Sequence, residues 1–303
     1  MFSVVIPYYK KRSYIERCID SALAQTYTDY EIIVVDDGSQ DDLKELIERK
    51  YSGKVHLIQQ ENQGVSAARN TGIAAATHDY IAFLDADDCW SPFYLEFSNI
   101  CLEKEDNVKI IGSNFTRIIK DIPLIRPNLN YLIIKNYFKE QVFKDTLFTS
   151  SSTIINYAFF RENIGFNSQL KRGEDLDVWF RAIASGGKVV YIENTLVYYS
   201  NEDLNQVTNS SFDFQYSILS IMRNEYLKKG SPNVFKEFVP IFIRKRIYSY
   251  YFDKRSHEKA REELKSIGYG NFFSKVFYHL PVSLGRNVSK TKLFRYYSKF
   301  LIK

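Results

Sequence analysis

Three aspartates stand within four residues at the end of an apolar run, in the stretch YIAFLDADDCW that covers residues 80–90. They are Asp85, Asp87 and Asp88. Asp85 and Asp87 are two residues apart, so in extended backbone their side chains point to the same side. Two carboxylates so placed repel each other unless a cation or hydrogen-bond donors lie between them. Hard oxygen ligands of this kind suit Mg²⁺ or Mn²⁺ held together with a phosphorylated ligand.

Two earlier apolar runs also end in residues that could bind a ligand. The run SVVIPYY ends with Pro7 and Tyr9, and the run EIIVVDD ends with Asp36 and Asp37. In an open parallel sheet, ligands bind beyond the carboxyl ends of the strands, so these side chains are candidates for a binding site. The alternative is that the acids cap turns and helix starts, and for Asp36 and Asp37 alone that alternative stays open.

Strand-like and helix-like stretches alternate through the first part of the chain. Ser13 and Glu16 have the spacing of a capping box ahead of the first helix, and Ser39 is the expected N-cap of the second. Continuous apolar strands in this order predict a parallel α/β sheet covered by helices on both faces. The strands, with helices between them, are expected over residues 3–9, 31–37, 55–60, 80–85 and 108–115.

The rest of the chain contains fewer clear patterns. Residues 173–187, GEDLDVWFRAIASGG, are expected to form a helix that the two glycines end, and KVVYIE and LVYYS are expected to be strands. From about Asn205 the chain becomes basic, aromatic and helical in pattern. We therefore predict an α/β domain over residues 1–205 and a C-terminal helical basic region over residues 206–303.

Five pieces in order resemble the nucleotide-sugar-dependent glycosyltransferases of family 2, which have the GT-A fold: VVIPYYK, SALAQTY, EIIVVDDGSQDD, NQGVSAARNTGI and YIAFLDADD. A further segment, RENIGFNSQLKRGEDLDVWFRA, resembles the acceptor side of that family, with its E-D-x5-R pattern at Glu174, Asp175 and Arg181. The resemblance spans roughly residues 2–200. It implies a Rossmann-like, mostly parallel α/β sheet flanked by helices, and an inverting enzyme of the bacterial surface-polysaccharide type. It also implies that residues 1–205 are the GT-A catalytic domain, in which a nucleotide-sugar half (about 1–115) precedes an acceptor half (about 116–205).

The resemblance also implies roles for residues on the donor side. Pro7 and Tyr9 would border the nucleotide base. Asp37 would accept a hydrogen bond from the base, most naturally from the N3–H of uracil. Arg69 would reach the nucleotide or its diphosphate. A UDP-sugar is therefore the expected donor substrate.

Asp85 and Asp87 would form the D-x-D motif of the family. Asp87 would bind a divalent metal, Mn²⁺ or Mg²⁺, directly, and Asp85 would share the metal site while lying nearer the ribose or the donor sugar. Such a cation neutralises the charge that develops on a departing diphosphate. Many relatives also have a histidine after the strand that corresponds to LVYYS, and this chain has none there. Glu202 or Asp203 could replace it, or the metal could be held by Asp87, diphosphate and water.

Asp175 would be the catalytic base, and Glu174 its neighbour at the acceptor. The acceptor hydroxyl must lose a proton as it attacks the anomeric carbon, and a carboxylate opposite the leaving group can take it. The dipole at the start of a helix is expected to keep that carboxylate ionised. The alternative is that Glu174 or Asp175 only caps the helix, and that Arg181 is a solvated helix residue or part of a surface ion pair.

Charge is divided unevenly along the chain, whose net charge is +5. Residues 223–303 carry 19 Lys and Arg against 6 Asp and Glu, whereas the remaining residues have a net negative charge. Such a basic tail predicts an anionic surface as a partner. We expect a membrane and no nucleic acid, because residues 289–303 have the pattern of an interfacial helix. The alternative is that the aromatic residues of the tail pack on the catalytic domain. The basic residues on one face of this helix are Lys292, Arg295, Lys299 and Lys303.

The start of the chain, MFSVVIPYY, leads into a strand without a basic leader, and no apolar stretch approaches the ~18 residues of a membrane span. We therefore expect a cytoplasmic protein, peripheral at the inner face of the cell membrane. The three scattered cysteines are expected to be reduced thiols.

These observations predict an inverting glycosyltransferase that moves a hexose from a UDP-sugar to a hydroxyl of a saccharide acceptor, a lipid-linked glycan in surface polysaccharide biosynthesis. Two alternatives are a nucleotidyltransferase and a non-catalytic nucleotide-sugar-binding protein. The first should open with a glycine-rich loop for triphosphate, and PYYKKRSY contains no glycine. In a non-catalytic nucleotide-sugar-binding protein, Asp175 at its predicted position would have no role.

Overall fold

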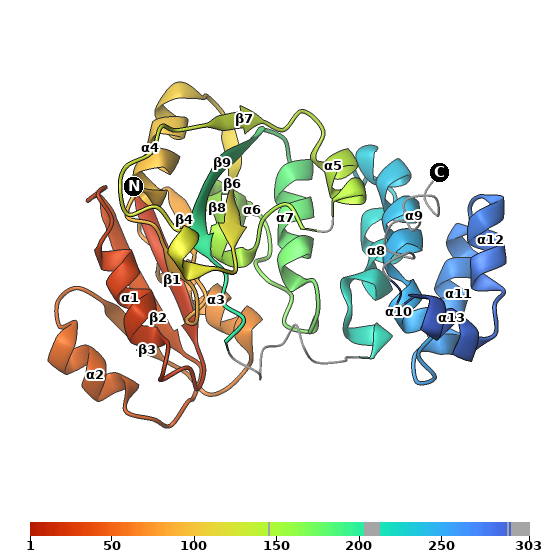
Figure 1. Ribbon diagram of the computed structural model, residues 1–303, viewed down its shortest axis with the longest axis horizontal. Helices are drawn as coiled ribbons and strands as arrows, with labels where there is room; N and C mark the ends of the chain where they lie inside the picture. Colours follow the sequence, from red (N-terminus) through yellow and green to blue (C-terminus); the bar gives the residue numbers. More distant parts are fainter. Residues whose placement is uncertain (145, 203–212, 290, 292–303) are drawn as a thin grey trace. The chain divides into compact units, whose positions relative to one another are not determined.

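The computed structural model describes residues 1–144, 146–202, 213–289 and 291 (Figure 1). The chain divides into two compact units. The first comprises Met1–Tyr137, Thr146–Ser168 and Glu174–Gln206, and the second comprises Phe138–Asp145, Gln169–Gly173 and Val207–Lys303. The basic face predicted for the C-terminal tail lies outside the described residues, and the predicted donor and acceptor halves stay a prediction.

The first unit is built on one mixed sheet. Among the described residues it has nine strands in the order β3-β2-β1-β4-β8-β6-β9-β5, with β7 paired to β9. The strands β3, β2, β1 and β4 are parallel to one another, as their continuous apolar runs predict. The bounds are β1 Phe2–Tyr8, β2 Tyr30–Asp36, β3 His56–Gln59, β4 Tyr80–Phe83, β5 Cys89–Trp90, β6 Val108–Thr116, β7 Tyr131–Ile133, β8 Thr153–Asn156 and β9 Lys188–Tyr198.

Beyond β4 the sheet is mixed. The strand predicted over residues 108–115 is present as β6, but it is not the next parallel strand after β4. β8 lies between β4 and β6 and is antiparallel to both. β6 and β9 are parallel, and β9 is one continuous strand where two were predicted. Because two antiparallel steps restore the original direction, β6 and β9 end at the same edge of the sheet as β1, β2 and β4.

Helices cover both faces of the sheet, as predicted (Figure 1). The helices α1 (Ile15–Leu23), α2 (Leu43–Lys50) and α4 (Tyr94–Lys104) pack on one face, in the core that contains Val4 and Ile6 of β1. The helices α3 (Val65–Ala75) and α7 (Glu174–Ala184) cover the other face, where Trp179 lies against Phe83 of β4. Short helical segments join these elements: η1 Ile119–Asp121, α5 Tyr137–Phe143, η2 Ser150–Ser152 and α6 Ala158–Glu162.

A glycine sets the distance between α3 and the sheet. A Cβ added at Gly72 would lie 2.4 Å from Cγ1 of Val5 on β1, so a larger residue would push the helix outward. Arg69 lies one turn earlier on the same helix and is buried. The close packing of α3 therefore holds the Arg69 side chain at the carboxyl edge of the sheet.

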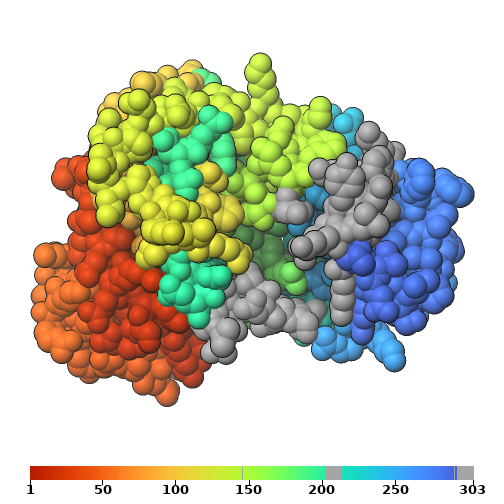
Figure 2. Space-filling view, viewed as in Figure 1, coloured from red at the N-terminus to blue at the C-terminus, as the bar shows by residue number. Residues whose placement is uncertain are grey.

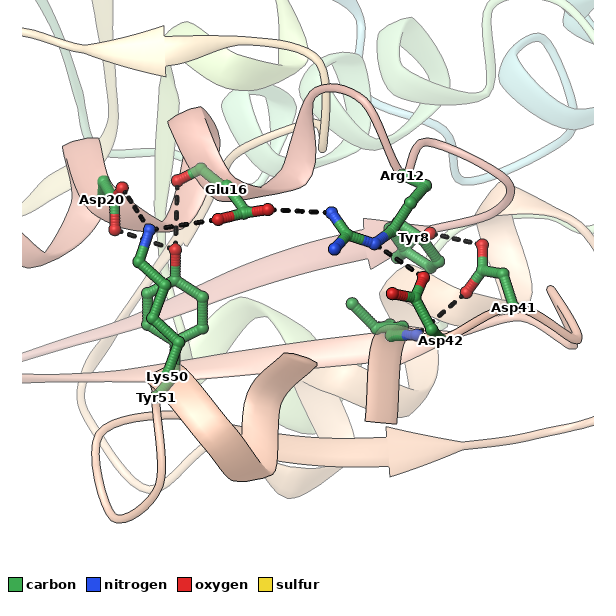
Figure 3. Close-up of polar contacts among 9 residues, drawn as sticks. Tyr8, Arg12, Glu16, Asp20, Asp41, Asp42, Lys50 and Tyr51 are labelled. Carbon is green, nitrogen blue, oxygen red and sulfur yellow. Dashed lines mark hydrogen bonds and ion pairs between the residues drawn. The ribbon is translucent and has the colours of Figure 1, made fainter. Parts of the chain in front are cut away.

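Ion pairs join α1 to α2 beside β1 (Figure 3). Lys50 contacts Asp20 at 2.9 Å and Glu16 at 3.2 Å, and Arg12 contacts Asp42 at 2.7 Å. These charged side chains are exposed or partly exposed to solvent, so each pair contributes little to stability. The network fixes how the two helices lie against each other, and it does not contain the candidate catalytic carboxylates.

Two helix starts differ from the predictions. The capping box of Ser13 and Glu16 is wrong, because α1 begins at Ile15 and the Glu16 side chain pairs with basic residues instead. Ser39 is not an N-cap either, since α2 begins four residues later. The Ser39 hydroxyl accepts a hydrogen bond from the backbone N–H of Lys10, which ties the loop after β2 to the loop after β1.

The second unit is helical, as its sequence predicts. Its core is aromatic: Phe138 packs against Phe238, and Tyr251 packs against Tyr278. None of the helices in the described ranges is long and apolar enough to cross a membrane. The cysteines of the chain, all in the first unit, are buried free thiols. The helical segments are η4 Phe214–Tyr216, α8 Ile218–Tyr226, α9 Val234–Arg246, α10 Tyr248–Tyr251, α11 His257–Ile267, α12 Phe272–Tyr278 and α13 Val282–Ser289.

Candidate active site

The predicted donor-side residues of β1 lie at the carboxyl edge of the sheet. Pro7 is buried within β1 and is in register with Val35 of β2. Tyr9 follows the strand and is 42% exposed, so it is accessible to a planar ligand. The roles of Tyr9 and Pro7 toward a nucleotide base stay predictions.

Asp37 is buried and holds the loop that follows β3. Its Oδ1 accepts hydrogen bonds from Nε2 of Gln60 at 2.8 Å and from the backbone N–H of Gln63 at 2.9 Å. Its Oδ2 accepts one from the backbone N–H of Gly64, at 2.8 Å. Gly64 directly precedes α3, so this carboxylate helps to fix the start of that helix. The alternative of a turn-stabilising acid is thus present in the structure, and the role of Asp37 toward a base stays a prediction.

Arg69 joins the first acid of the D-x-D motif to the predicted acceptor side. Its Nη2 donates to Oδ1 of Asp85 at 2.7 Å, and its Nη1 donates to Oε1 of Glu174 at 3.3 Å. The guanidinium also lies over the ring of Phe166, 5.1 Å from the centroid. Arg69 is 3% exposed, and a charge so buried is stable only with such partners. Arg69 thereby contacts an acid that lies 105 positions further along the sequence.

Replacing Arg69 by methionine should lower the free energy of unfolding by about 3–5 kcal/mol, because the change leaves Asp85 and Glu174 without their buried partner. The positive charge of Arg69 lowers the pKa of Asp175, so its loss should also move the onset of activity to higher pH. Urea unfolding and a pH–rate profile measure the two effects. Arg49→Met, at an exposed position of α2, is the control and should change stability by less than about 0.5 kcal/mol. Equal urea midpoints for the two variants would contradict the bridging role.

Asp87 lies beside two basic residues from the beginning of the chain. Its Oδ2 contacts Nζ of Lys11 at 2.8 Å, and its backbone carbonyl accepts a hydrogen bond from Nη2 of Arg17 at 3.0 Å. Both aspartates of the motif therefore carry a counter-charge from the protein, Asp85 from Arg69 and Asp87 from Lys11. These cations offset the repulsion that the sequence predicts between the acids.

Asp88, the third acid of the run, has a structural role. It is buried, its carboxylate accepts a hydrogen bond from the Ser151 hydroxyl, and its Oδ1 accepts another from the backbone N–H of Ser200 at 2.7 Å. Burial, followed by the charges of Asp85 and Asp87, raises the pKa of Asp88 well above its usual range. Asp88 thus links the D-x-D loop to the segment before β8 and to the end of β9.

Asp175 stands in the first turn of α7, beside Glu174. Its Oδ1 accepts a hydrogen bond from the backbone N–H of Leu176 at 2.8 Å. The helix dipole favours the ionised form of this carboxyl, as predicted from the sequence, but two stronger effects oppose it. Burial and then the charge of Glu174 raise the pKa of Asp175 to about 7, against the opposing effect of Arg69. A carboxyl with this pKa gains and loses a proton near neutral pH, as a general base must.

The donor set at the edge of the sheet fits a metal that arrives with a diphosphate. Within the described part of the chain, no three His, Cys, Asp or Glu residues gather as a metal site made by protein alone. Mg²⁺ is often held by one or two carboxylates together with substrate phosphates and water, and Asp85 and Asp87 can supply those carboxylates. The carboxylate of Glu202 accepts hydrogen bonds from Arg17 and from the Tyr198 hydroxyl, so it has a basic partner as Asp85 and Asp87 do, and its role as third ligand stays a prediction. Asp203 lies outside the described residues.

Arg181 fastens a loop to α7. It pairs with Asp177 at 2.7 Å and donates hydrogen bonds to the backbone carbonyls of Ile164 and Gly165, both at 2.7 Å. Asn70 of α3 holds the same loop through the backbone of Phe166. The E-D-x5-R pattern therefore supplies two acids at the site, Glu174 and Asp175, and one arginine that holds the loop of residues 164–166 against α7.

Sequence reasoning missed three residues of the site. Lys11, Arg17 and Ser151 take part in its contacts, and none was assigned a role there, whereas Asp88 was named among the acids without a role of its own. The pair of lysines directly after the first strand was a usable signal, because cations at an edge rich in acids lower their repulsion. Ser151 had no such signal, since it is one of three consecutive serines in a segment without a clear pattern.

Comparisons with known proteins identify the family. The model of glycosyl transferase family 2 matches residues 3–163, more than half of the chain. An uncharacterized glycosyltransferase of Rickettsia prowazekii is 27% identical over 99% of this chain and 96% of its own length. The glycosyltransferase EpsJ of Bacillus subtilis is 32% identical over 69% of this chain and 63% of its own, and the chondroitin synthase of Escherichia coli is 29% identical over 65% and 30%.

The fold is also that of solved glycosyltransferases. TarS of S. aureus, residues 1–349, solved in complex with UDP-GlcNAc, superposes with a TM-score of 0.71 at 16% identity, over 99% of this chain and 87% of that one. A mannosyltransferase of Pyrobaculum calidifontis, solved with GDP-Man and Mn²⁺, gives a TM-score of 0.52 at 13% identity, over 99% and 83%. The predicted GT-A fold is confirmed, with a helical C-terminal extension. The protein thus belongs to glycosyl transferase family 2 and is a glycosyltransferase.

Proposed function

We propose that this glycosyltransferase inverts configuration as it moves a hexose from a UDP-sugar to a hydroxyl of a saccharide acceptor. The observation that carries the proposal is the meeting of the D-x-D loop and the start of α7 at Arg69. Through this contact, Asp85 and Asp87, which could hold a metal together with the diphosphate of the donor, lie in the same site as Asp175, which could act as the base. A binding protein without catalysis has no use for a carboxyl whose pKa lies at about 7 beside that donor site.

In this proposal Asp175 is the base. Because its Oδ1 is engaged by the backbone N–H of Leu176, the acceptor hydroxyl gives its proton to Oδ2. The acceptor oxygen attacks the anomeric carbon on the face opposite the diphosphate, so the new glycosidic bond has inverted configuration as the bond to the diphosphate breaks. Glu174, held by Arg69, lies on the acceptor side of the base.

Asp87, with Asp85 beside it, would hold Mn²⁺ or Mg²⁺ between the protein and the diphosphate. The cation would neutralise the charge on the leaving UDP. Tyr9 and Pro7 would border the base, with Asp37 accepting from uracil. The solved complexes of TarS with UDP-GlcNAc and of the mannosyltransferase with GDP-Man and Mn²⁺ support a nucleotide-sugar donor and a metal.

For the acceptor we propose a lipid-linked glycan of bacterial surface polysaccharide synthesis, reached from the cytoplasmic face of the membrane. The support is the basic, acid-free sequence after Lys265, which suits an anionic membrane surface. A donor screen by saturation-transfer NMR tests the proposal at its first step. UDP-hexoses should give signal transfer that grows with Mg²⁺, which is diamagnetic, and GDP-sugars should give less. Preference for a GDP-sugar would overturn the choice of UDP.

The proposed base predicts a pH dependence. Asp175 must lose its proton to act, and its pKa of about 7 means that kcat should rise about tenfold per pH unit below neutrality and level off above it. Initial rates at saturating donor and metal, measured from roughly pH 5 to pH 9, check this expectation. A profile that is flat below neutrality would show that the base is a group with an ordinary carboxyl pKa.

A further inference from the structure

Four large aliphatic side chains are exposed within eight residues next to the candidate active site. They belong to residues 117–126, which join β6 to the stretch before β7 and include the short helix η1. Leu124 is 79% exposed and Ile125 is 87% exposed, and Ile118 and Ile119 are exposed about by half. Single exposed aliphatic residues are ordinary on a protein surface, but a group of this kind marks a contact surface.

The segment is firmly anchored, so the exposure is not that of a loose loop. Ile122 is buried and packs with Cys89 and Tyr198. The backbone carbonyl of Pro123 accepts a hydrogen bond from the Ser91 hydroxyl at 2.8 Å, and Arg126 pairs with Glu96 at 2.7 Å. These anchors bury one aliphatic side chain of the segment and hold the remaining four outward.

The segment begins at the edge of the sheet that carries the candidate active site. Thr116, the last residue of β6, accepts a hydrogen bond from the backbone N–H of Tyr199, next to the Ser200 that Asp88 holds. Arg117 lies over the ring of Tyr199 at 5.1 Å. Figure 2 shows the yellow atoms of this part of the chain on the surface, beside the teal atoms at the end of β9.

We infer that residues 117–126 form a surface that docks on an anionic lipid membrane. Lys120 and Arg117 are exposed beside the four aliphatic side chains, against the single acid Asp121, so the segment pairs an apolar edge with net positive charge. That pattern suits insertion into the boundary between acyl chains and anionic headgroups. The inference rests on the proposed function for its purpose, which is to bring a lipid-linked acceptor beside Asp175.

The composition favours a membrane over a second protein. Protein interfaces are enriched in Tyr, Trp, Phe, Met and Arg, and their strongest contacts rarely come from leucine. The exposed apolar residues here are isoleucine and leucine, and Arg126 is already paired with Glu96. A standard protein interface also takes roughly 20–30 residues from each side, and this segment has ten.

The test uses tryptophan as a reporter in the full-length protein. Ile125→Trp places an indole on the segment, and Ile164→Trp places one at a matched exposed aliphatic position of the same unit. The two native tryptophans, Trp90 and Trp179, are buried and give a constant background. Vesicles of phosphatidylcholine with phosphatidylglycerol should shift the emission of Ile125→Trp to the blue and leave Ile164→Trp unchanged. An equal shift in both variants, or none in Ile125→Trp, would overturn the inference.

Sedimentation with the same vesicles gives a second measurement. The double variant Leu124→Ser, Ile125→Ser should bind about tenfold more weakly than wild type, and Ile164→Ser should bind as wild type. Binding should fall with added salt and be weaker to phosphatidylcholine alone. Unchanged binding of the double variant would place the membrane contact elsewhere, for example at the exposed Phe272 and Phe273 of α12. A change in its sedimentation velocity without vesicles would identify the segment as a self-association surface.

Donor hydrolysis without vesicles separates this inference from the proposed function. The double variant touches no candidate catalytic residue, so it should hydrolyse a UDP-sugar at the rate of wild type. If the emission of Ile125→Trp shifts with vesicles but wild type hydrolyses no donor, the proposed function fails and the membrane surface stands. If donor hydrolysis is normal and no shift occurs, the membrane surface fails alone.

Discussion

Asp175→Asn is expected to lower kcat by a factor on the order of 10²–10⁴, with the affinity for the donor close to that of wild type. Asparagine has nearly the shape of aspartate and can still accept the hydrogen bond from the backbone N–H of Leu176. It cannot take a proton from the acceptor hydroxyl. Steady-state kinetics with a saturating donor measure kcat, and isothermal titration with UDP and Mn²⁺ measures donor-side binding.

Glu174→Gln is the matched control for this change. Glu174 is the immediate neighbour of Asp175 and contacts Arg69 at 3.3 Å, so its loss should weaken that pair without removing the base. The charge of Glu174 raises the pKa of Asp175, and the pH–rate profile of Glu174→Gln should therefore move to lower pH. If Glu174→Gln abolishes turnover and Asp175→Asn leaves it intact, Glu174 is the base.

Asp87→Ala is expected to abolish transfer and metal-dependent UDP binding while the protein remains folded. The change removes the carboxylate that is proposed to hold the cation, and a diphosphate is a poor leaving group without that charge. Binding of UDP with and without Mn²⁺ should no longer differ, and circular dichroism should remain that of wild type. Near-normal activity in this variant, together with a wild-type enzyme that resists chelators, would contradict the metal role.

Lys11→Met separates the metal role of Asp87 from its ion pair. Lys11 contacts Asp87 at 2.8 Å, so both variants lose that pair, but only Asp87→Ala loses the carboxylate. Under the proposal, Lys11→Met keeps Mn²⁺-dependent UDP binding. Equal loss of UDP binding in the two variants would mean that the Lys11–Asp87 pair holds the donor site together, and that Asp87 is not needed as a metal ligand.

The sequence predicts the helices and strands of residues 1–115 well, because most of them are long enough to show a clear pattern of apolar residues. The runs that became β1 and β2 are apolar over most of their length, and buried parallel strands read in that way. The acids at their ends could be placed at one edge from the order of the elements alone. The start of α7 was also found, since an acidic first turn before an apolar face is a helix signal.

The contacts that bring the residues of the site together could not be predicted from the sequence. Arg69 meets Glu174 because α3 and α7 pack on the same face, and no local pattern tells which helices are neighbours. β8 was missed because four residues are too few to show a period, and with it the order of the sheet beyond β4. The pKa of Asp175 depends on burial and on the charge of Glu174, so the helix dipole alone could not predict its net shift.

Hydrolysis of the donor by water, followed by proton NMR, tests the central claim most directly. An inverting transferase releases UDP slowly without an acceptor, and the first sugar formed has the anomeric configuration opposite to that of the donor. We predict that Mn²⁺ stimulates this release from a UDP-hexose, that Asp87→Ala abolishes it, and that an α-linked donor first yields the β-sugar. Release of pyrophosphate, retention of configuration, or no release from any UDP-sugar with Mn²⁺ present would contradict the account.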